Sequence, residues 1–162
     1  MTRTSDGQFR CYTKDWKSAK ADLCAIRETV FIREQGVQVS EEWDGLDSSA
    51  RHFLIEPADK ATPLVVGCAR ILEEPWQGSM ALHIGRVAVL RPWRKLGVGT
   101  ALMTTMLDWC SRKEHVHKLV FLHAQLGVIT FYEKLGFAAT GPVFMDAGIE
   151  HRTMVLRENV QN

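Results

Sequence analysis

The chain has few cysteines, and none of them lie close together. Cys11, Cys24, Cys68 and Cys110 are far apart in the 162-residue sequence, and no Cys-x-x-Cys pair occurs. Zinc ribbons and dithiol redox motifs require such pairs, so the sequence indicates neither of these sites. We therefore expect free, buried thiols and no bound metal.

Long apolar runs and an excess of one charge are also missing. No apolar stretch approaches the roughly 18 residues that a membrane-spanning helix needs. The first ten residues, MTRTSDGQFR, also lack the apolar core of a signal peptide. The 20 Lys and Arg residues balance 19 Asp and Glu residues, which is unlike the basic surface of a nucleic-acid-binding protein. We therefore expect a cytoplasmic protein with neither membrane nor nucleic acid as a partner.

The length and the hydrophobic patterns favour one α/β domain over residues 1–162. A chain of this size with 46% hydrophobic residues can bury a core without disulfide bonds. The patterns predict a mixed, mostly antiparallel central sheet flanked by helices. Strands are predicted at residues 9–14, 51–56, 64–73, 80–89, 117–123, 137–145 and 151–156, and helices at residues 16–35, 98–112 and 128–135.

One stretch combines a strand, a glycine loop and the start of a helix. Residues 84–103 read IGRVAVLRPWRKLGVGTALM, with Gly97 and Gly99 just before the helical pattern. Backbone N–H groups at a helix start attract anions, and glycines let a ligand approach the backbone closely. Arg94 and Lys95 add positive charge. The stretch predicts a phosphate or pyrophosphate site, although a tight structural turn is the simpler alternative for two glycines.

Two motifs in this order resemble the GNAT superfamily of acyl-CoA N-acyltransferases. Arg94-x-x-Gly97-x-Gly99, after Arg86-Val87-Ala88-Val89, is similar to the family's pyrophosphate-binding motif. Gln125 and the segment Phe131–Phe137 are similar to the second half of the same signature. The resemblance covers residues 64–156. It implies the GNAT fold, with acetyl-CoA as co-substrate and a primary amine of a small molecule or peptide as the acceptor of the acetyl group. Because no cysteine lies in either motif, we expect direct transfer in a ternary complex.

The resemblance also implies which residues hold the cofactor. In the family, the strand before the loop offers main-chain groups to the pantetheine arm, and the glycine loop holds the pyrophosphate. Gln125 stands where many relatives have asparagine, and its side chain is one methylene longer. The expected cofactor contacts are Val87, Ala88, Val89, Arg94, Lys95, Leu96, Gly97, Val98, Gly99, Thr100 and Gln125.

Two catalytic residues follow from the same comparison. A tyrosine of the second motif protonates the departing thiolate in the family, and Tyr132 holds that place; a core tyrosine is the alternative. His83 lies 11 residues before Arg94, where the superfamily's histone acetyltransferases have a glutamate base. The ordinary pKa of histidine suits proton acceptance near neutrality, but a lone strand histidine is often structural. The rival bases are His123, His151, Glu34 and Asp44.

Residues 36–50 form an acidic stretch without a clear pattern. The stretch is either a solvated surface loop or a rim that attracts a cationic amine. For the second interpretation we expect Glu34, Trp43 and Asp44 to contact the substrate.

The N-terminal half narrows the resemblance to the ElaA-like GNAT proteins. The segments Arg27–Gln35, Glu42–Asp47 and Ala147–His151 carry it. Part of this pattern, together with Gly67–Arg70, is also similar to the acyl-homoserine-lactone synthases, which share the fold. Two alternatives therefore stay open, namely a synthase-like acyltransferase and a non-catalytic acyl-CoA-binding sensor. The sequence also leaves a homodimer open.

Overall fold

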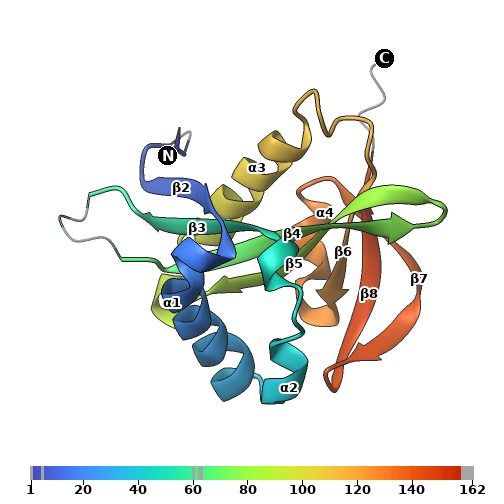
Figure 1. The fold of residues 1–162 in the computed structure, drawn as a ribbon, viewed down its shortest axis with the longest axis horizontal. Helices are drawn as coiled ribbons and strands as arrows, with labels where there is room; N and C mark the ends of the chain where they lie inside the picture. The colour runs from blue at the N-terminus through green and yellow to red at the C-terminus, as the bar shows by residue number, and fades with distance from the viewer. Residues whose placement is uncertain (1, 5, 60, 62–63, 158–162) are drawn as a thin grey trace.

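A twisted sheet forms the centre of the molecule. The computed structural model describes residues 2–4, 6–59, 61 and 64–157 (Figure 1). Within these residues, eight strands run in the order β1-β2-β3-β4-β5-β6-β8-β7, and every neighbouring pair is antiparallel except β5 with β6. The predicted mixed, mostly antiparallel sheet is therefore confirmed. The strands are β1 (Thr2–Arg3), β2 (Phe9–Lys14), β3 (Arg51–Pro57), β4 (Gly67–Trp76), β5 (Ser79–Val89), β6 (Val120–Gln125), β7 (Phe137–Asp146) and β8 (Ile149–Leu156).

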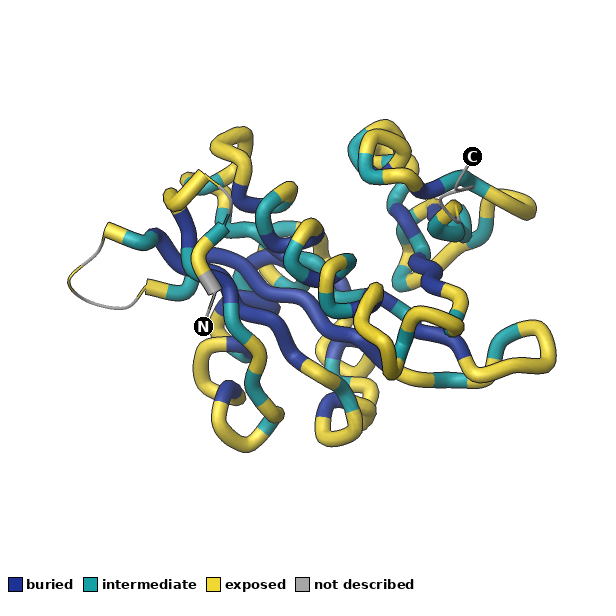
Figure 2. The backbone as a smooth tube through the Cα atoms, turned by 90° about the horizontal axis from the view of Figure 1, so that it is seen from above, coloured by how far each residue is buried: buried dark blue, intermediate teal, exposed yellow. Residues whose placement is uncertain are grey.

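Helices cover both faces of this sheet. In the described residues they are α1 (Trp16–Arg27), α2 (Val39–Glu42), α3 (Val98–Cys110) and α4 (Ile129–Glu133). The apolar side of α1 forms one buried cluster with β3 and β4, and α3 and α4 contribute to a larger cluster on the opposite face. Figure 2 shows the buried residues running along the central strands, with exposed residues on the outer loops and helix faces. The three-layer arrangement follows from sheet strands that are buried on both faces.

The first predicted helix forms over its full length but changes its winding. Asp15 caps α1 by accepting a hydrogen bond from the Ser18 N–H at 2.8 Å. After Arg27 the chain continues as a π-helix, Glu28–Glu34, which spacing alone does not reveal. Gly36, with φ of +71°, follows the helix end as predicted, because glycine adopts this left-handed conformation without strain.

The acidic stretch at residues 36–50 is held against the sheet by buried ion pairs. Glu42 and Asp47 are only 2% and 5% exposed. Arg27 donates from Nε to Glu42 Oε1 at 2.6 Å and from Nη1 to Asp47 Oδ1 at 2.7 Å. A solvated loop is therefore the wrong description for these two carboxylates. Buried charges need partners of opposite sign, and the partners come from distant segments.

Candidate active site

The candidate site lies where β5 and β6 part. The two strands pair in parallel only where Leu82–Ile84 of β5 lie beside Val120–Leu122 of β6. A cavity of about 710 Å³ opens beyond these pairs, between the end of β5 and residues His123–Gln125 of β6. In Figure 1, β6, β8 and β7 continue the sheet beyond β5, on the side away from α1. The volume of this cavity lies within the usual range of small-molecule and cofactor sites.

A bulge in β5 shapes one wall of the cavity. Cys68 pairs with Ala88, but Arg70 pairs with Gly85, so β5 carries one more residue than β4 across the interval. Arg86 in this bulge has φ of +52°, in the left-handed region. Such bulges bend a strand and interrupt its regular pairing.

The acidic stretch fixes this bulge through Arg86. The Arg86 guanidinium donates to the backbone carbonyls of Glu41 and Glu42 at 3.2 and 3.1 Å. It also forms an ion pair with Asp44 at 3.2 Å. The strained backbone at Arg86 is thus held by contacts from α2 and the turn after it.

The glycine loop meets the cavity at the start of α3. Gly97, with φ of +85°, precedes the first residue of α3, and no side chain caps this helix. A Cβ at Gly97 would meet no atom within 4 Å, so the loop leaves open space at this point. Gly97, Gly99 and Thr100 line the cavity. Uncapped N–H groups at a helix start, with open space before them, fit a pyrophosphate group.

Arg94 forms two hydrogen bonds beside this loop. Its Nε donates to the Val89 carbonyl at 2.8 Å, and its Nη2 donates to Glu34 Oε2 at 2.9 Å. Arg94 and Lys95 both line the cavity, whereas Glu34 does not. Glu34, expected at the substrate, instead binds the arginine of the loop.

Tyr132 projects from α4 into the same cavity. Its side chain is buried, and within the described residues no hydrogen bond to its hydroxyl is formed. Burial raises the pKa of Tyr132 to about 12, so the hydroxyl keeps its proton at neutral pH. The Phe131 and Phe137 rings pack around it at centroid distances of 5.0 and 6.0 Å. The hydroxyl is therefore a proton donor that is available to a ligand.

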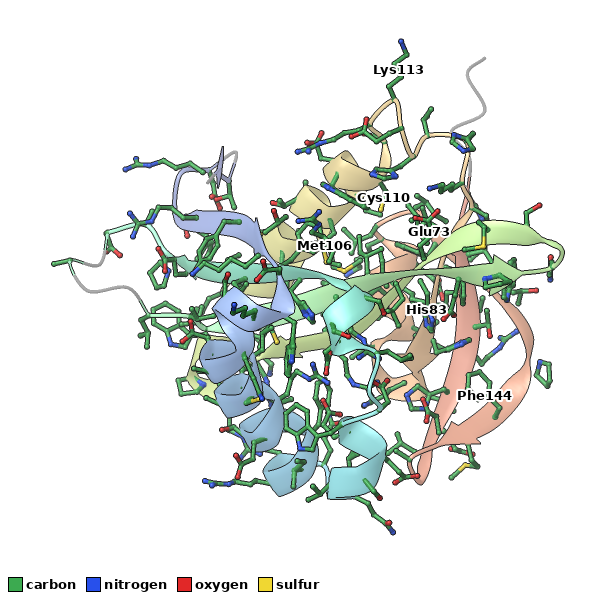
Figure 3. The ribbon with its side chains drawn as sticks, viewed as in Figure 1. Glu73, His83, Met106, Cys110, Lys113 and Phe144 are labelled. Atoms are coloured by element: carbon green, nitrogen blue, oxygen red, sulfur yellow. The ribbon has the colours of Figure 1, made fainter. Side chains whose placement is uncertain are left out.

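His83 lies on β5 at the opposite end of the cavity from the glycine loop. Its Nδ1 is 2.7 Å from Glu74 Oε1, and its ring stacks on Phe121 with a centroid distance of 4.4 Å. Burial lowers the pKa of His83 below its ordinary value, although Glu74 opposes this shift. Figure 3 shows His83 and Phe144 on the part of the sheet that α1 leaves uncovered.

Most of the expected cofactor residues come together at the cavity. Gln125 also donates from Nε2 to Gln35 Oε1 at 2.9 Å, which links β6 to the end of the π-helix. Leu96 is 55% exposed and Val98 is buried in the core, and neither side chain lines the cavity. The expected residues that line it are Val87, Ala88, Val89, Arg94, Lys95, Gly97, Gly99, Thr100 and Gln125, together with Tyr132 and His83.

The residues expected to contact the substrate lie elsewhere. The Trp43 ring packs over the Arg27 guanidinium at 4.8 Å, and Asp44 accepts a hydrogen bond from Arg70 Nη1 at 3.0 Å. The carboxylates that do line the cavity without an ion pair, among the described residues, are Glu41 and Asp146. Glu41 was part of the acidic stretch, but nothing local in the sequence distinguishes it from its neighbours.

The described residues contain neither a metal-binding cluster nor a membrane-spanning helix. No cluster of three or more His, Cys, Asp or Glu side chains there is suited to a metal ion. Among the same residues, no helix combines the length and apolar character needed to cross a membrane.

The fold and the site together fit an enzyme that uses a phosphate-bearing co-substrate. The acetyltransferase (GNAT) family model matches residues 10–137. The chain therefore belongs to the GNAT family of acyltransferases, in its ElaA-like branch.

Two bacterial relatives illustrate this membership. ElaA of Escherichia coli is 33% identical over 140 residues, which span 86% of this chain and 87% of that protein. YyaT of Bacillus subtilis is 33% identical over 143 residues, spanning 85% of this chain and 90% of YyaT. An alignment that spans 85% or more of this chain necessarily includes residues 94–137, where the glycine loop and the motif with Tyr132 lie.

Solved structures share the architecture. The crystal structure of Escherichia coli ElaA matches with a TM-score of 0.76 at 28% identity, covering 92% of this chain and 99% of ElaA. A GNAT family acetyltransferase from Elizabethkingia anophelis, solved with acetyl-CoA bound, matches with a TM-score of 0.61 at 17% identity, covering 91% of this chain and 95% of that one. The second likeness concerns the fold alone.

Proposed function

We propose that this protein is an acetyl-CoA-dependent N-acetyltransferase that acts on a primary amine of a small molecule or peptide. The observation that carries the proposal is one continuous cavity lined by the glycine loop, Tyr132 and His83. Acetyl-CoA bound to a GNAT protein of the same fold supports the choice of donor. We place the activity in the cytoplasm, and a homodimer is compatible with it.

The chain offers a fitting set of groups for the co-substrate. The N–H groups at the start of α3 would hold the pyrophosphate, with Arg94 and Lys95 adding charge. The cavity-facing edge of β5 at Val87–Val89 would pair with the amides of the pantetheine arm. When bound, acetyl-CoA supplies the thioester whose C–S bond breaks as the new C–N bond forms.

Two side chains handle the protons of this reaction. An acceptor ammonium must lose two protons to become an amide. His83 accepts the first at Nε2 and passes it to solvent, which leaves a neutral, nucleophilic nitrogen. Tyr132 gives its proton to the departing sulfur and is reprotonated by the second proton of the nitrogen.

Direct transfer is favoured over an acyl-enzyme. None of the four cysteines lines the cavity. Burial raises the pKa of Cys68 and Cys110 to about 12, and that of Cys11 to about 11, so these thiols stay protonated. A thiolate nucleophile is therefore absent at the described site, and the amine attacks the thioester within a ternary complex.

A thiol-release assay tests the proposal. The purified protein is incubated with acetyl-CoA in the presence and absence of a panel of primary amines, and free CoA is measured. Amine-dependent release with an acetylated product supports the transferase. Tight acetyl-CoA binding without release for any amine favours the acyl-CoA sensor, and release with longer acyl-CoA donors alone favours the synthase-like acyltransferase.

A further inference from the structure

Three histidines from neighbouring strands line the end of the cavity away from the glycine loop. His83 lies on β5, His123 on β6 and His151 on β8. The His83 and His123 rings meet edge to face at a centroid distance of 4.7 Å. Phe144 connects the other pair, since its ring contacts His123 at 5.0 Å and stacks on His151 at 5.9 Å. The trio is thus a continuous wall.

Each imidazole is fixed through the same nitrogen. Nδ1 of His151 lies 2.7 Å from the Ile149 carbonyl, and Nδ1 of His123 lies 3.1 Å from Thr153 Oγ1. Nδ1 of His83 faces the Glu74 carboxylate. A carbonyl or carboxylate only accepts hydrogen bonds, so in His83 and His151 the Nδ1 carries the hydrogen and a neutral ring offers a lone pair at Nε2.

The Nε2 atoms are left for a ligand. Within the described residues, no hydrogen bond to Nε2 of the three rings is formed, and none of these atoms is a buried nitrogen without a partner. Burial lowers the pKa of His123 to about 4, and the neighbouring His83 adds to this shift. Thr153 Oγ1 can accept as well as donate, so Nε2 of His123 is an acceptor in the tautomer whose Nδ1 donates to Thr153. With this tautomer all three rings present acceptor nitrogens to the cavity.

The charges around this wall disfavour an acidic ligand. Arg70 is paired with Asp44 and Asp47, and Arg86 is paired with Asp44. Of the described cations that line the cavity, Lys95 alone has no carboxylate partner, and it belongs to the glycine loop. A carboxylate or phosphate next to the acceptor amine would find no free cation here.

Two carboxylates in the cavity favour a ligand with a positive charge. Glu41 on α2 and Asp146 at the end of β7 line the cavity and are exposed. Neither takes part in an ion pair among the described residues. They favour an approaching ammonium group by long-range attraction.

We propose that His83, His123 and His151 form the acceptor site, where their Nε2 atoms accept hydrogen bonds from the amino group of a primary amine that carries no acidic group. This inference deepens the proposed function and rests on it. The site selects an amine with a neutral or cationic body and rejects free amino acids.

Three matched probes test the substrate class. The probes have the same aromatic body and differ in the group beside the amine. Phenethylamine has no such group, phenylalaninamide has a neutral amide, and phenylalanine has a carboxylate. The kcat/KM values are measured at one pH, and each is divided by the fraction of that amine that is neutral. The corrected values for phenethylamine and phenylalaninamide are expected to exceed that for phenylalanine by about tenfold or more. Equal or faster turnover of phenylalanine overturns the inference, while the transferase proposal stands.

Ring-conserving variants test the histidines themselves. His123→Phe and His151→Phe keep the aromatic packing but remove Nε2, so KM for phenethylamine is expected to rise about tenfold with KM for acetyl-CoA unchanged. His117→Phe, in the exposed loop after α3, is the matched control and leaves both values unchanged. An unchanged KM for the amine in folded cavity variants overturns the acceptor site.

A measurement on the wild-type protein tests the same site without relying on the folding of any variant. Phenethylamine is titrated without acetyl-CoA while the imidazole resonances are followed by NMR. The signals of His83, His123 and His151 are expected to shift, and those of His52 and His117 are not. Shifts without turnover would support the site while the transferase proposal fails, whereas turnover without these shifts would overturn the site alone.

Discussion

Nδ1 of His83 lies 2.7 Å from Oε1 of Glu74, across the β4–β5 pair. The contact fixes the tautomer of the histidine and leaves Nε2 as the proton acceptor. It also opposes the loss of basicity that burial imposes on the ring. A general base needs both features, which is why we propose His83 for that role.

Glu74→Gln is expected to lower kcat/KM about tenfold and to change its pH dependence. Burial lowers the pKa of His83, and the charges of Arg70 and Arg86 lower it further. Glu74 raises this pKa. The His123 ring faces His83 from β6. Removing the Glu74 charge lowers this pKa further. The rise of kcat/KM with pH, measured with one amine throughout, therefore moves to lower pH.

The neighbouring residue provides the control for this experiment. Glu73 binds Lys118 at the surface, outside the cavity. Glu73→Gln should therefore leave the pH profile unchanged. A profile that shifts equally in both variants would contradict a specific role of Glu74.

Tyr132→Phe is expected to reduce kcat by about two orders of magnitude, since a proton donor to the leaving group is lost. Affinity for acetyl-CoA should change little, because the ring still fills its place beside Phe131 and Phe137. The raised pKa of about 12 keeps the wild-type hydroxyl protonated throughout the neutral range. The chain has two tyrosines, and Tyr12→Phe on β2 is the matched control. An unchanged kcat in Tyr132→Phe would remove it from the mechanism.

Asp47→Asn is expected to destabilise the fold by about 3 to 5 kcal/mol, because two buried guanidinium groups lose a shared anion. Asp47 Oδ1 accepts from Arg27 at 2.7 Å and from Arg70 at 2.9 Å. Burial alone would raise the pKa of Asp47, but these two arginines outweigh it and hold the pKa below its ordinary value.

The sign of this pKa shift sets the pH window. The stabilisation is present above the ordinary pKa of an aspartate and is lost as the pH falls through the lowered value. Urea unfolding at pH 7 and at lower pH measures it, with the exposed Asp108→Asn on α3 as the control. A loss of stability for Asp47→Asn no larger than for the control would refute the buried network.

Glu34→Gln is expected to tighten acetyl-CoA binding about threefold, because Arg94 then offers an unshared charge to the phosphates. In the described structure Arg94 Nη2 donates to Glu34 at 2.9 Å. Calorimetric titration gives the affinity. Glu28→Gln, which removes a surface partner of Arg33, is the control. Weaker binding in Glu34→Gln would mean that Glu34 positions Arg94 rather than competing for it.

The sequence predicted the strands, the glycine loop and the motif with Tyr132. Strand alternation and the glycine motif placed Gly97 at the start of a helix, and the second motif placed Tyr132 in the same cavity. The helix start rests on residues close together in the chain, where periodicity and turn chemistry decide the structure, whereas the place of Tyr132 was implied by the family resemblance.

The rest depends on contacts between distant segments. Asp44 and Glu41 look alike in an acidic stretch, and the pairing of Asp44 with Arg70, 26 residues away, separates them. Likewise, His151 reaches the cavity because β8 pairs with β6 at Gln125, a register that spacing along the chain does not define. The π-helix after Arg27 follows the same apolar spacing as an α-helix.

The most direct test of the central claim is a calorimetric titration of acetyl-CoA into wild type, Gly97→Trp and Gly78→Trp. Both glycines have φ of +85° and open space at Cβ, so the two variants carry the same backbone strain, but Gly78 lies in the β4–β5 turn outside the cavity. We predict micromolar binding to wild type and Gly78→Trp and none to folded Gly97→Trp. No binding to wild type, or equal binding to all three proteins, would contradict a co-substrate held on the glycine loop.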